Sequence, residues 1–206
     1  RDTPRVISQS TTPRQTLAKS SRHLRAVMVG HLREEKSPQT LFEAARLLIA
    51  CTDIRIDHIG AALDPLLAEQ ARQTALLCPN YRWLGGLDHE ATRRRIQRAH
   101  VLVHCSRMEG GAHVLMEAVC SGTLVLASKV DGNVGMLGAD YGGLFPWGDA
   151  PALAQLLLRC REDVQGGQSS ASIFSRLQAQ CRLRAPLFEP AAERHALLAL
   201  LQELTQ

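Results

Sequence analysis

The chain has 206 residues, of which 45% are hydrophobic and 21% are charged, and its formal net charge at pH 7 is +4. This length and apolar fraction predict one domain with a full core, and no run approaches the ~18 apolar residues that a membrane span needs. The three arginines at 93–95 would point in different directions on a helix, so we interpret them as a solvated face and expect no nucleic-acid partner.

Six cysteines occur without a Cys-x-x-Cys pair, and several lie in apolar runs. This pattern favours reduced core residues in a cytoplasmic protein over disulfides or zinc ligands. Histidines, cysteines and carboxylates show no metal-binding spacing, so no metal is expected. Because the chain begins at Arg1 without a methionine, we expect a fragment or a processed piece.

Hydrophobic periodicity and turn residues divide the chain into short elements. Residues 1–24 are polar and interrupted by prolines, which predicts a linker or extended lead-in with a short strand at 5–8. Strands are expected at 25–30, 54–60, 81–85, 101–104, 124–128 and 141–145. Helices are expected at 38–49, 64–77, from 88, from 112, from 149, at 170–183 and at 190–204, with a glycine-rich loop at 131–135.

This alternation of strands and helices predicts an α/β fold with a parallel sheet covered on both faces. Ligands of such sheets bind beyond the carboxyl ends of the strands. The loops after Gly30, Gly60, Gly85 and His104 should meet at that edge.

The stretch at 106–122 contains charged residues that the packing of a strand and a helix does not require. Glu109 precedes the turn Gly110–Ala112, and an apolar helix follows in which His113 and Glu117 are neighbours at i and i+4. Free N–H groups at the turn would suit a phosphate, and the two carboxylates would accept hydrogen bonds from hydroxyls. The combination suits a sugar nucleotide; the alternative is an ordinary strand-turn-helix with two solvated glutamates.

Lys36 and Arg33 follow the first strand in the loop after Gly30. Cations aimed at a diphosphate leaving group would stabilise the charge that develops on it. The alternative is an ordinary charged surface loop.

The spacing of Glu109 and Glu117 resembles the E-x7-E signature of retaining GT-B glycosyltransferases of family 4, although Gly111 stands where that family has an aromatic residue. The loop from Gly30 to Lys36 is similar to the family's G-R-L…E-K-G pattern, whose Arg and Lys hold the nucleotide diphosphate. Here His31 replaces the arginine, so either Arg33 or His31 would take its place.

Residues 81–85 resemble the family's strand and loop that hold the nucleobase. Backbone groups around Arg82, Trp83 and Leu84 would then contact uracil, and an aromatic ring could stack on it. The alternative is that Trp83 only fills the core.

The resemblance implies the C-terminal, Rossmann-like half of a GT-B enzyme that binds a UDP-sugar, with UDP-N-acetylglucosamine expected. Residues 25–188 would form the nucleotide-sugar domain, and residues 189–206 a helix that packs toward an absent N-terminal acceptor domain. Glu109, Lys36 and Arg33 would be catalytic. Glu117, His113, the Gly110–Ala112 turn, Gly30, His31 and residues 82–84 would bind the donor, without a cofactor or metal.

Longer strings, including HLREEKSP and SRMEGGAHVLMEA, look like the selenosugar synthase subgroup of selenoneine biosynthesis. That likeness implies a small anionic acceptor, selenophosphate. The alternatives are a family 4 enzyme with a sugar or lipid acceptor, a hydrolysing or epimerising sugar-nucleotide enzyme, and a non-catalytic nucleotide-binding module.

Overall fold

The structure, a computed structural model, describes residues 9–167, 169 and 172–204. The short strand expected at 5–8 lies outside these residues. The strands are β1 (Leu24–Val29), β2 (Ile54–Ile59), β3 (Tyr81–Trp83), β4 (Val101–His104), β5 (Leu124–Ser128) and β6 (Leu144–Phe145). The α-helices are α1 (Pro38–Leu47), α2 (Pro65–Leu77), α3 (His89–Arg98), α4 (His113–Val119), α5 (Asp131–Leu137), α6 (Ala150–Gly166), α7 (Ile173–Arg184) and α8 (Pro190–Leu204), with short 3-10 helices η1 (Glu34–Lys36) and η2 (Ala185–Phe188).

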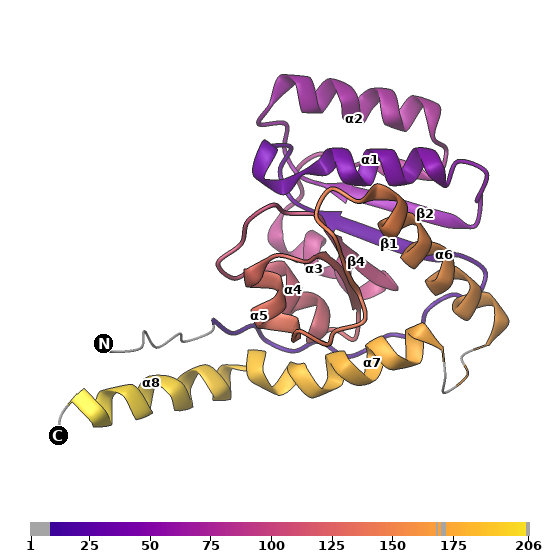
Figure 1. The fold of residues 1–206 in the computed structure, drawn as a ribbon. Coiled ribbons are helices and arrows are strands. Elements are labelled where there is room, and N and C mark those ends of the chain that lie inside the picture. Colours follow the sequence, from indigo (N-terminus) through magenta and orange to yellow (C-terminus); the bar gives the residue numbers. More distant parts are fainter. Residues whose placement is uncertain (1–8, 168, 170–171, 205–206) are drawn as a thin grey trace.

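The strands form one parallel sheet in the order β3-β2-β1-β4-β5-β6. This order is that of a doubly wound Rossmann-like sheet, which reverses between β1 and β4. The predicted α/β fold is therefore confirmed. Figure 1 shows α1, α2 and α6 on one side of the sheet and α3, α4 and α7 on the other.

Helices on both faces explain the burial of the central strands. Every residue of β4 and β5 is buried, and their sequences, VLVH and LVLAS, are nearly continuous apolar runs. Strands buried on both faces have this composition because neither face contacts water. Five of the six cysteines are also buried and all six are free, as expected.

The glycine-rich loop expected at 131–135 is wrong, because residues 131–137 form α5. Two glycines in seven residues lower the intrinsic helix propensity, and tertiary contacts override it. The side-chain amide of Asn133 donates to the Ser128 carbonyl at 2.9 Å. A Cβ atom on Gly132 would lie 1.9 Å from the Glu109 carbonyl oxygen, so only glycine allows α5 to lie this close to the turn after β4.

The lead-in after residue 8 has no regular secondary structure, but it packs on the domain. The Thr11 and Arg14 N–H groups donate to the carbonyls of Phe188 and Cys120, both at 2.9 Å. Lys19 Nζ donates to the Gly122 carbonyl at 2.9 Å. These bonds hold the segment along the side of the domain that carries α4 and η2.

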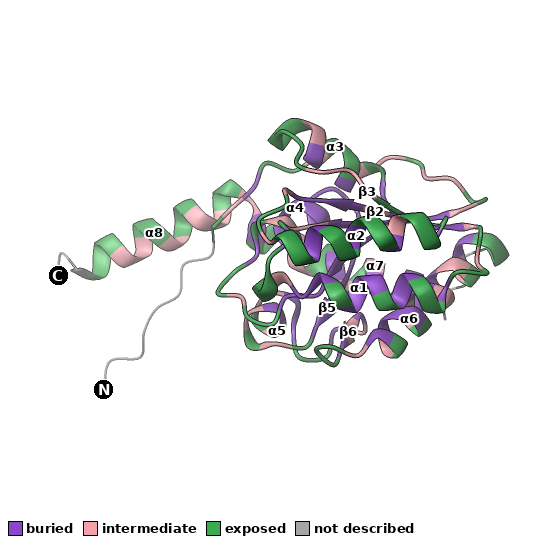
Figure 2. Ribbon diagram, turned by 90° about the horizontal axis from the view of Figure 1, so that it is seen from above, coloured by how far each residue is buried: buried purple, intermediate pink, exposed green. Residues whose placement is uncertain are grey.

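Helix α8 projects beyond the layered body in both views (Figures 1 and 2). Its exposed leucines are Leu197, Leu198 and Leu201. The expectation that it packs toward a further domain stays a prediction. Within the described residues, none of the helices has the length and apolar content of a bilayer crossing.

Candidate functional site

The loops at the carboxyl ends of the strands converge, as strand polarity predicted. The Gly60 N–H donates to the Gly85 carbonyl at 2.8 Å, which joins the loops after β2 and β3. The Arg107 N–H donates to the Glu35 carbonyl at 2.9 Å, which joins the loops after β4 and β1. Side chains from loops far apart in the sequence therefore meet at this edge.

Glu109 is the centre of the first cluster at the edge. Its side chain is 12% exposed and forms an ion pair with Lys36, the last residue of η1. His104, the last residue of β4, places Nε2 3.2 Å from the same carboxylate oxygen. A Cβ on Gly30 would lie 3.4 Å from Lys36 Cγ, so the glycine leaves room for the lysine stem.

The protonation states in this cluster follow from its burial. Burial alone would raise the pKa of Glu109, but the close approach of His104 and the ion pair with Lys36 outweigh it and hold that pKa well below its ordinary value. Burial lowers the pKa of His104 despite the nearby carboxylate. At pH 7 the cluster is therefore an ionised glutamate, a neutral imidazole and a lysine.

Two buried polar atoms of this cluster have no well-aligned hydrogen bond to any described residue, His104 Nε2 and Ser106 Oγ. Both atoms lie beside the Glu109 carboxylate without good hydrogen-bond geometry, with His104 Nε2 at 3.2 Å, and they help to stabilise its negative charge.

A groove of about 940 Å³ opens beside Glu109. It is lined by the Gly110–Gly111 turn, by α5 and by the start of α8. This volume matches that of small-molecule sites, roughly 300–1,000 Å³. The turn itself is exposed, and the N–H groups of Gly110 and Gly111 make no hydrogen bond to a described residue. Ala112 is buried, and its N–H points at Met136 Sδ at 3.3 Å.

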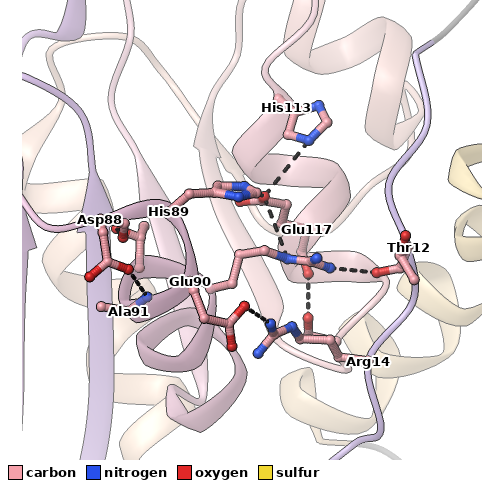
Figure 3. Close-up of polar contacts among 11 residues, drawn as sticks. Thr12, Arg14, Asp88, His89, Glu90, Ala91, His113 and Glu117 are labelled. Carbon is pink, nitrogen blue, oxygen red and sulfur yellow. Dashed lines mark hydrogen bonds and ion pairs between the residues drawn. The ribbon is translucent and has the colours of Figure 1, made fainter.

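Glu117 is the centre of the second cluster, on α4 (Figure 3). The carboxylate is 5% exposed, and its Oε1 lies 2.7 Å from His89 Nε2 and 3.7 Å from His113 Nε2. Arg93 Nε lies 3.6 Å from the same oxygen. The mostly buried side chain of Arg93 places a positive charge beside this carboxylate, which offsets the cost of burying it.

His89, His113 and Glu117 also form a candidate metal-ligand set, since their ligand atoms all lie within 4.8 Å of one another. Sequence spacing alone revealed no such group, because His89 comes from a different helix. Arg93 argues against a divalent ion, since its guanidinium already approaches the carboxylate that the ion would need.

Two residues of the loop after β1 lie apart from Glu109. Arg33 is exposed, and among the described residues its only ion pair is with Glu35, at 3.9 Å. His31 Nδ1 accepts a hydrogen bond from the Ala61 N–H at 3.0 Å and so links two loops. The structure brings Lys36 to the carboxylate but does not bring Arg33 there.

Of the residues expected to contact a nucleobase, Arg82 and Trp83 lie in β3 and Leu84 follows it. The Leu84 N–H donates to the His58 carbonyl at 2.8 Å and is therefore not free to contact a base. Trp83 is half-buried, with Nε1 donating to the Gly60 carbonyl at 2.9 Å and the Arg72 guanidinium 5.6 Å from the ring centroid. The Arg82 side chain pairs with Asp57.

Sequence reasoning missed three neighbours of the two glutamates, His104, His89 and Arg93. His104 ends a buried strand, a position that projects toward the ligand edge, and this could have been noticed. His89 and Arg93 gave no signal, because their contact with Glu117 depends on how α3 packs against α4.

The parallel sheet order and the flanking helices define a Rossmann-like α/β domain of the GT-B type. Residues 9–165 match the family of glycosyl transferases group 1, so the chain belongs to that family. None of the curated proteins gives a significant match to this chain.

Solved structures with this fold include TarM of S. aureus, a mutant of which was crystallised with fondaparinux, alpha-GlcNAc-glycerol and UDP (16% identity, TM-score 0.69, 95% of this chain and 37% of that one). HepE of Anabaena in complex with UDP is similar as well (22% identity, TM-score 0.69, 88% of this chain and 49% of that one). Sucrose-phosphate synthase of Thermosynechococcus elongatus is a third similar structure (25% identity, TM-score 0.68, 90% of this chain and 46% of that one). The chain spans less than half the length of each.

Proposed function

We propose that this chain is the donor-binding half of a retaining glycosyltransferase that uses a UDP-sugar. The observation that carries the proposal is the pair of buried carboxylates at one sheet edge, each beside a basic side chain. Glu117 with Arg93 would hold the ribose hydroxyls, and Glu109 would hold the sugar ring. Lys36 would stabilise the diphosphate as the glycosidic bond breaks.

Family membership and the UDP-bound structures support a nucleotide-sugar donor. We propose N-acetylglucosamine as the sugar and selenophosphate as the acceptor, both from the sequence resemblance. In that reaction the anomeric carbon forms a bond to selenium as its bond to the UDP oxygen breaks. A small, nucleophilic anion needs little general-base activation and suits an open turn with free N–H groups.

The test is to incubate the intact protein, with any domain that precedes Arg1, with UDP-N-acetylglucosamine and either selenophosphate or simple sugar alcohols. Mass spectrometry of the products should show a selenosugar only in the first mixture. If the sugar is transferred to a hydroxyl acceptor and selenophosphate does not react, the proposed acceptor is wrong, but the proposed glycosyl transfer still holds. Hydrolysis of the donor alone would favour a hydrolase, and tight UDP binding without turnover a non-catalytic module.

A further inference from the structure

Five arginines gather in a groove of about 240 Å³, which shares only Arg82 with the residues expected to bind the donor. They come from three strands and one helix: Arg25 of β1, Arg55 of β2, Arg82 of β3, and Arg95 and Arg98 of α3. All five are exposed, while the buried residues Ala26, Val27 and Ala99 complete the lining. We call this surface the arginine groove.

The arginine groove contains one carboxylate, Asp57, which is already shared. Its Oδ1 accepts from Arg82 Nε and Nη2 at 2.9 and 2.7 Å, and its Oδ2 accepts from Arg95 Nη1 at 3.2 Å. Five positive charges therefore face one negative charge, and a single carboxylate cannot neutralise them.

The sheet register places two of these positive charges side by side. Arg25 of β1 pairs in register with Arg55 of β2, so their side chains are neighbours on the same face of the sheet. Like charges at such positions destabilise a sheet. Arg55 Nη2 lies 3.1 Å from His23 Nε2, a nitrogen that can only accept if it is unprotonated. The side chains of Arg25 and Arg98 form no hydrogen bond or ion pair with another residue of the described part of the chain.

The groove is also distinct from the donor site in its position. Arg25 lies at the amino-terminal end of β1, and Arg98 is the last residue of α3. His89 begins the same helix and contacts Glu117. The two sites therefore lie toward opposite ends of α3, with the groove on the side away from the carboxyl edge of the sheet.

We propose that the arginine groove binds a compact phosphate-bearing anion. Guanidinium groups present a rigid fork of donors that matches phosphate oxygens in pairs, and several forks converge here. The small volume suits one phosphate or diphosphate group. The buried alanines and valine of the lining offer no donors, so the arginines supply the recognition.

Inorganic pyrophosphate is the probe, titrated into the chain by calorimetry at low salt. Lys36→Ala is the background for every variant, so that binding beside Glu109 is removed. The double variant Arg25→Ala/Arg98→Ala should weaken binding by at least about tenfold, since each charge-assisted hydrogen bond to an anion contributes roughly that factor. Asp57→Asn should strengthen binding, because it frees Arg82 and Arg95 from their competing carboxylate.

The matched control for Arg98→Ala is Arg94→Ala, which likewise removes one charge from an exposed position of the same helix, outside the groove. Arg94→Ala should change the affinity for pyrophosphate by less than about twofold. An equal loss of affinity in Arg94→Ala and in the double variant would mean that net charge alone explains the effect, and it would overturn the proposal. Arg98→Ala alone, at an exposed helix end, provides a second variant if the double variant does not fold.

A parallel experiment separates a free phosphate from a lipid headgroup. The chain is sedimented with phosphatidylglycerol vesicles, with and without pyrophosphate. If the chain binds the vesicles through Arg25 and Arg98 and pyrophosphate does not displace it, that result would overturn the proposal in favour of a membrane contact. No binding of pyrophosphate in the Lys36→Ala background would overturn it outright, whereas the proposed donor site would be unaffected.

Discussion

Lys36 and Glu109 form an ion pair across 73 positions of sequence. The pair joins the loop after β1 to the turn after β4, and both side chains are mostly buried. The ion pair therefore holds both side chains at the carboxyl edge of the sheet. The roles proposed above would separate the two side chains when a donor binds, with Lys36 at the diphosphate and Glu109 at the sugar.

Replacing each partner should separate their roles. Lys36→Ala should weaken UDP and UDP-sugar alike, since both carry the diphosphate. Glu109→Ala should weaken the UDP-sugar far more than UDP, since only the former has a sugar ring. Calorimetry with both ligands on both variants measures this difference.

Arg33→Ala is the matched control for Lys36, because it removes a cation from the same loop that lies apart from Glu109. Its effect on UDP binding should be smaller than that of Lys36→Ala. If Arg33→Ala caused the larger loss, Arg33 would be the diphosphate ligand and the assignment of Lys36 would be wrong.

Glu117→Ala should weaken UDP binding by about 1.5–3 kcal/mol, the usual contribution of a hydrogen bond to a charged group. Glu90→Ala is a control from the start of α3, since Glu90 pairs with Arg14 and does not contact Glu117. Calorimetry, with a thermal melt to verify folding, provides the measurement. An unchanged affinity in a folded Glu117→Ala variant would remove Glu117 from the ribose site.

Treatment with EDTA should leave UDP binding and transfer by the intact protein unchanged. Arg93 occupies one side of the Glu117 carboxylate, so a divalent ion at His89, His113 and Glu117 would have to overcome its charge. Titration with Zn²⁺ and Mg²⁺ should show no strong site that depends on His113. A Zn²⁺ site lost in His113→Ala, or activity that returns only with Mg²⁺, would contradict this prediction.

Stability should fall on mild acidification because of His58. Burial lowers the pKa of His58 from 6.5 to about 4, against a hydrogen bond to the Gly30 carbonyl. Between these two values the unfolded chain binds a proton that the folded chain refuses, so the free energy of unfolding decreases as the pH falls from 6.5 to 4. The full shift corresponds to up to about 3 kcal/mol for this group.

Urea titrations at several pH values test this dependence, with His58→Gln as the variant. The free energy of unfolding should decrease less steeply with falling pH in His58→Gln than in the original chain. Part of the slope should remain, because burial also lowers the pKa of His100 to about 4. An identical slope in both proteins would show that His58 does not titrate as described.

Much of the fold could be predicted because its signals are local. Apolar runs such as those at 101–104 and 124–128 are typical of strands buried on both faces. The helix starts at Asp64 and Asp88 carry their own caps, since each side chain accepts from N–H groups of the first turn. Helix α5 was wrongly predicted as a loop, because Gly132 allows a close approach to Glu109, and this approach depends on another part of the chain.

The sequence by itself determined the sheet, its carboxyl edge and the two glutamates on either side of the turn. Strand polarity follows from each local segment, and Glu109 and Glu117 are only eight positions apart. Only the tertiary structure decided which side chains face those carboxylates. Lys36 rather than Arg33 reaches Glu109, and His89 and Arg93 reach Glu117.

The arginine groove also depends on tertiary structure. Three strands and a helix bring together charges that lie up to 73 positions apart, from Arg25 to Arg98. Electrostatic contacts of this kind depend on distance in space, which the order of residues along the chain does not specify.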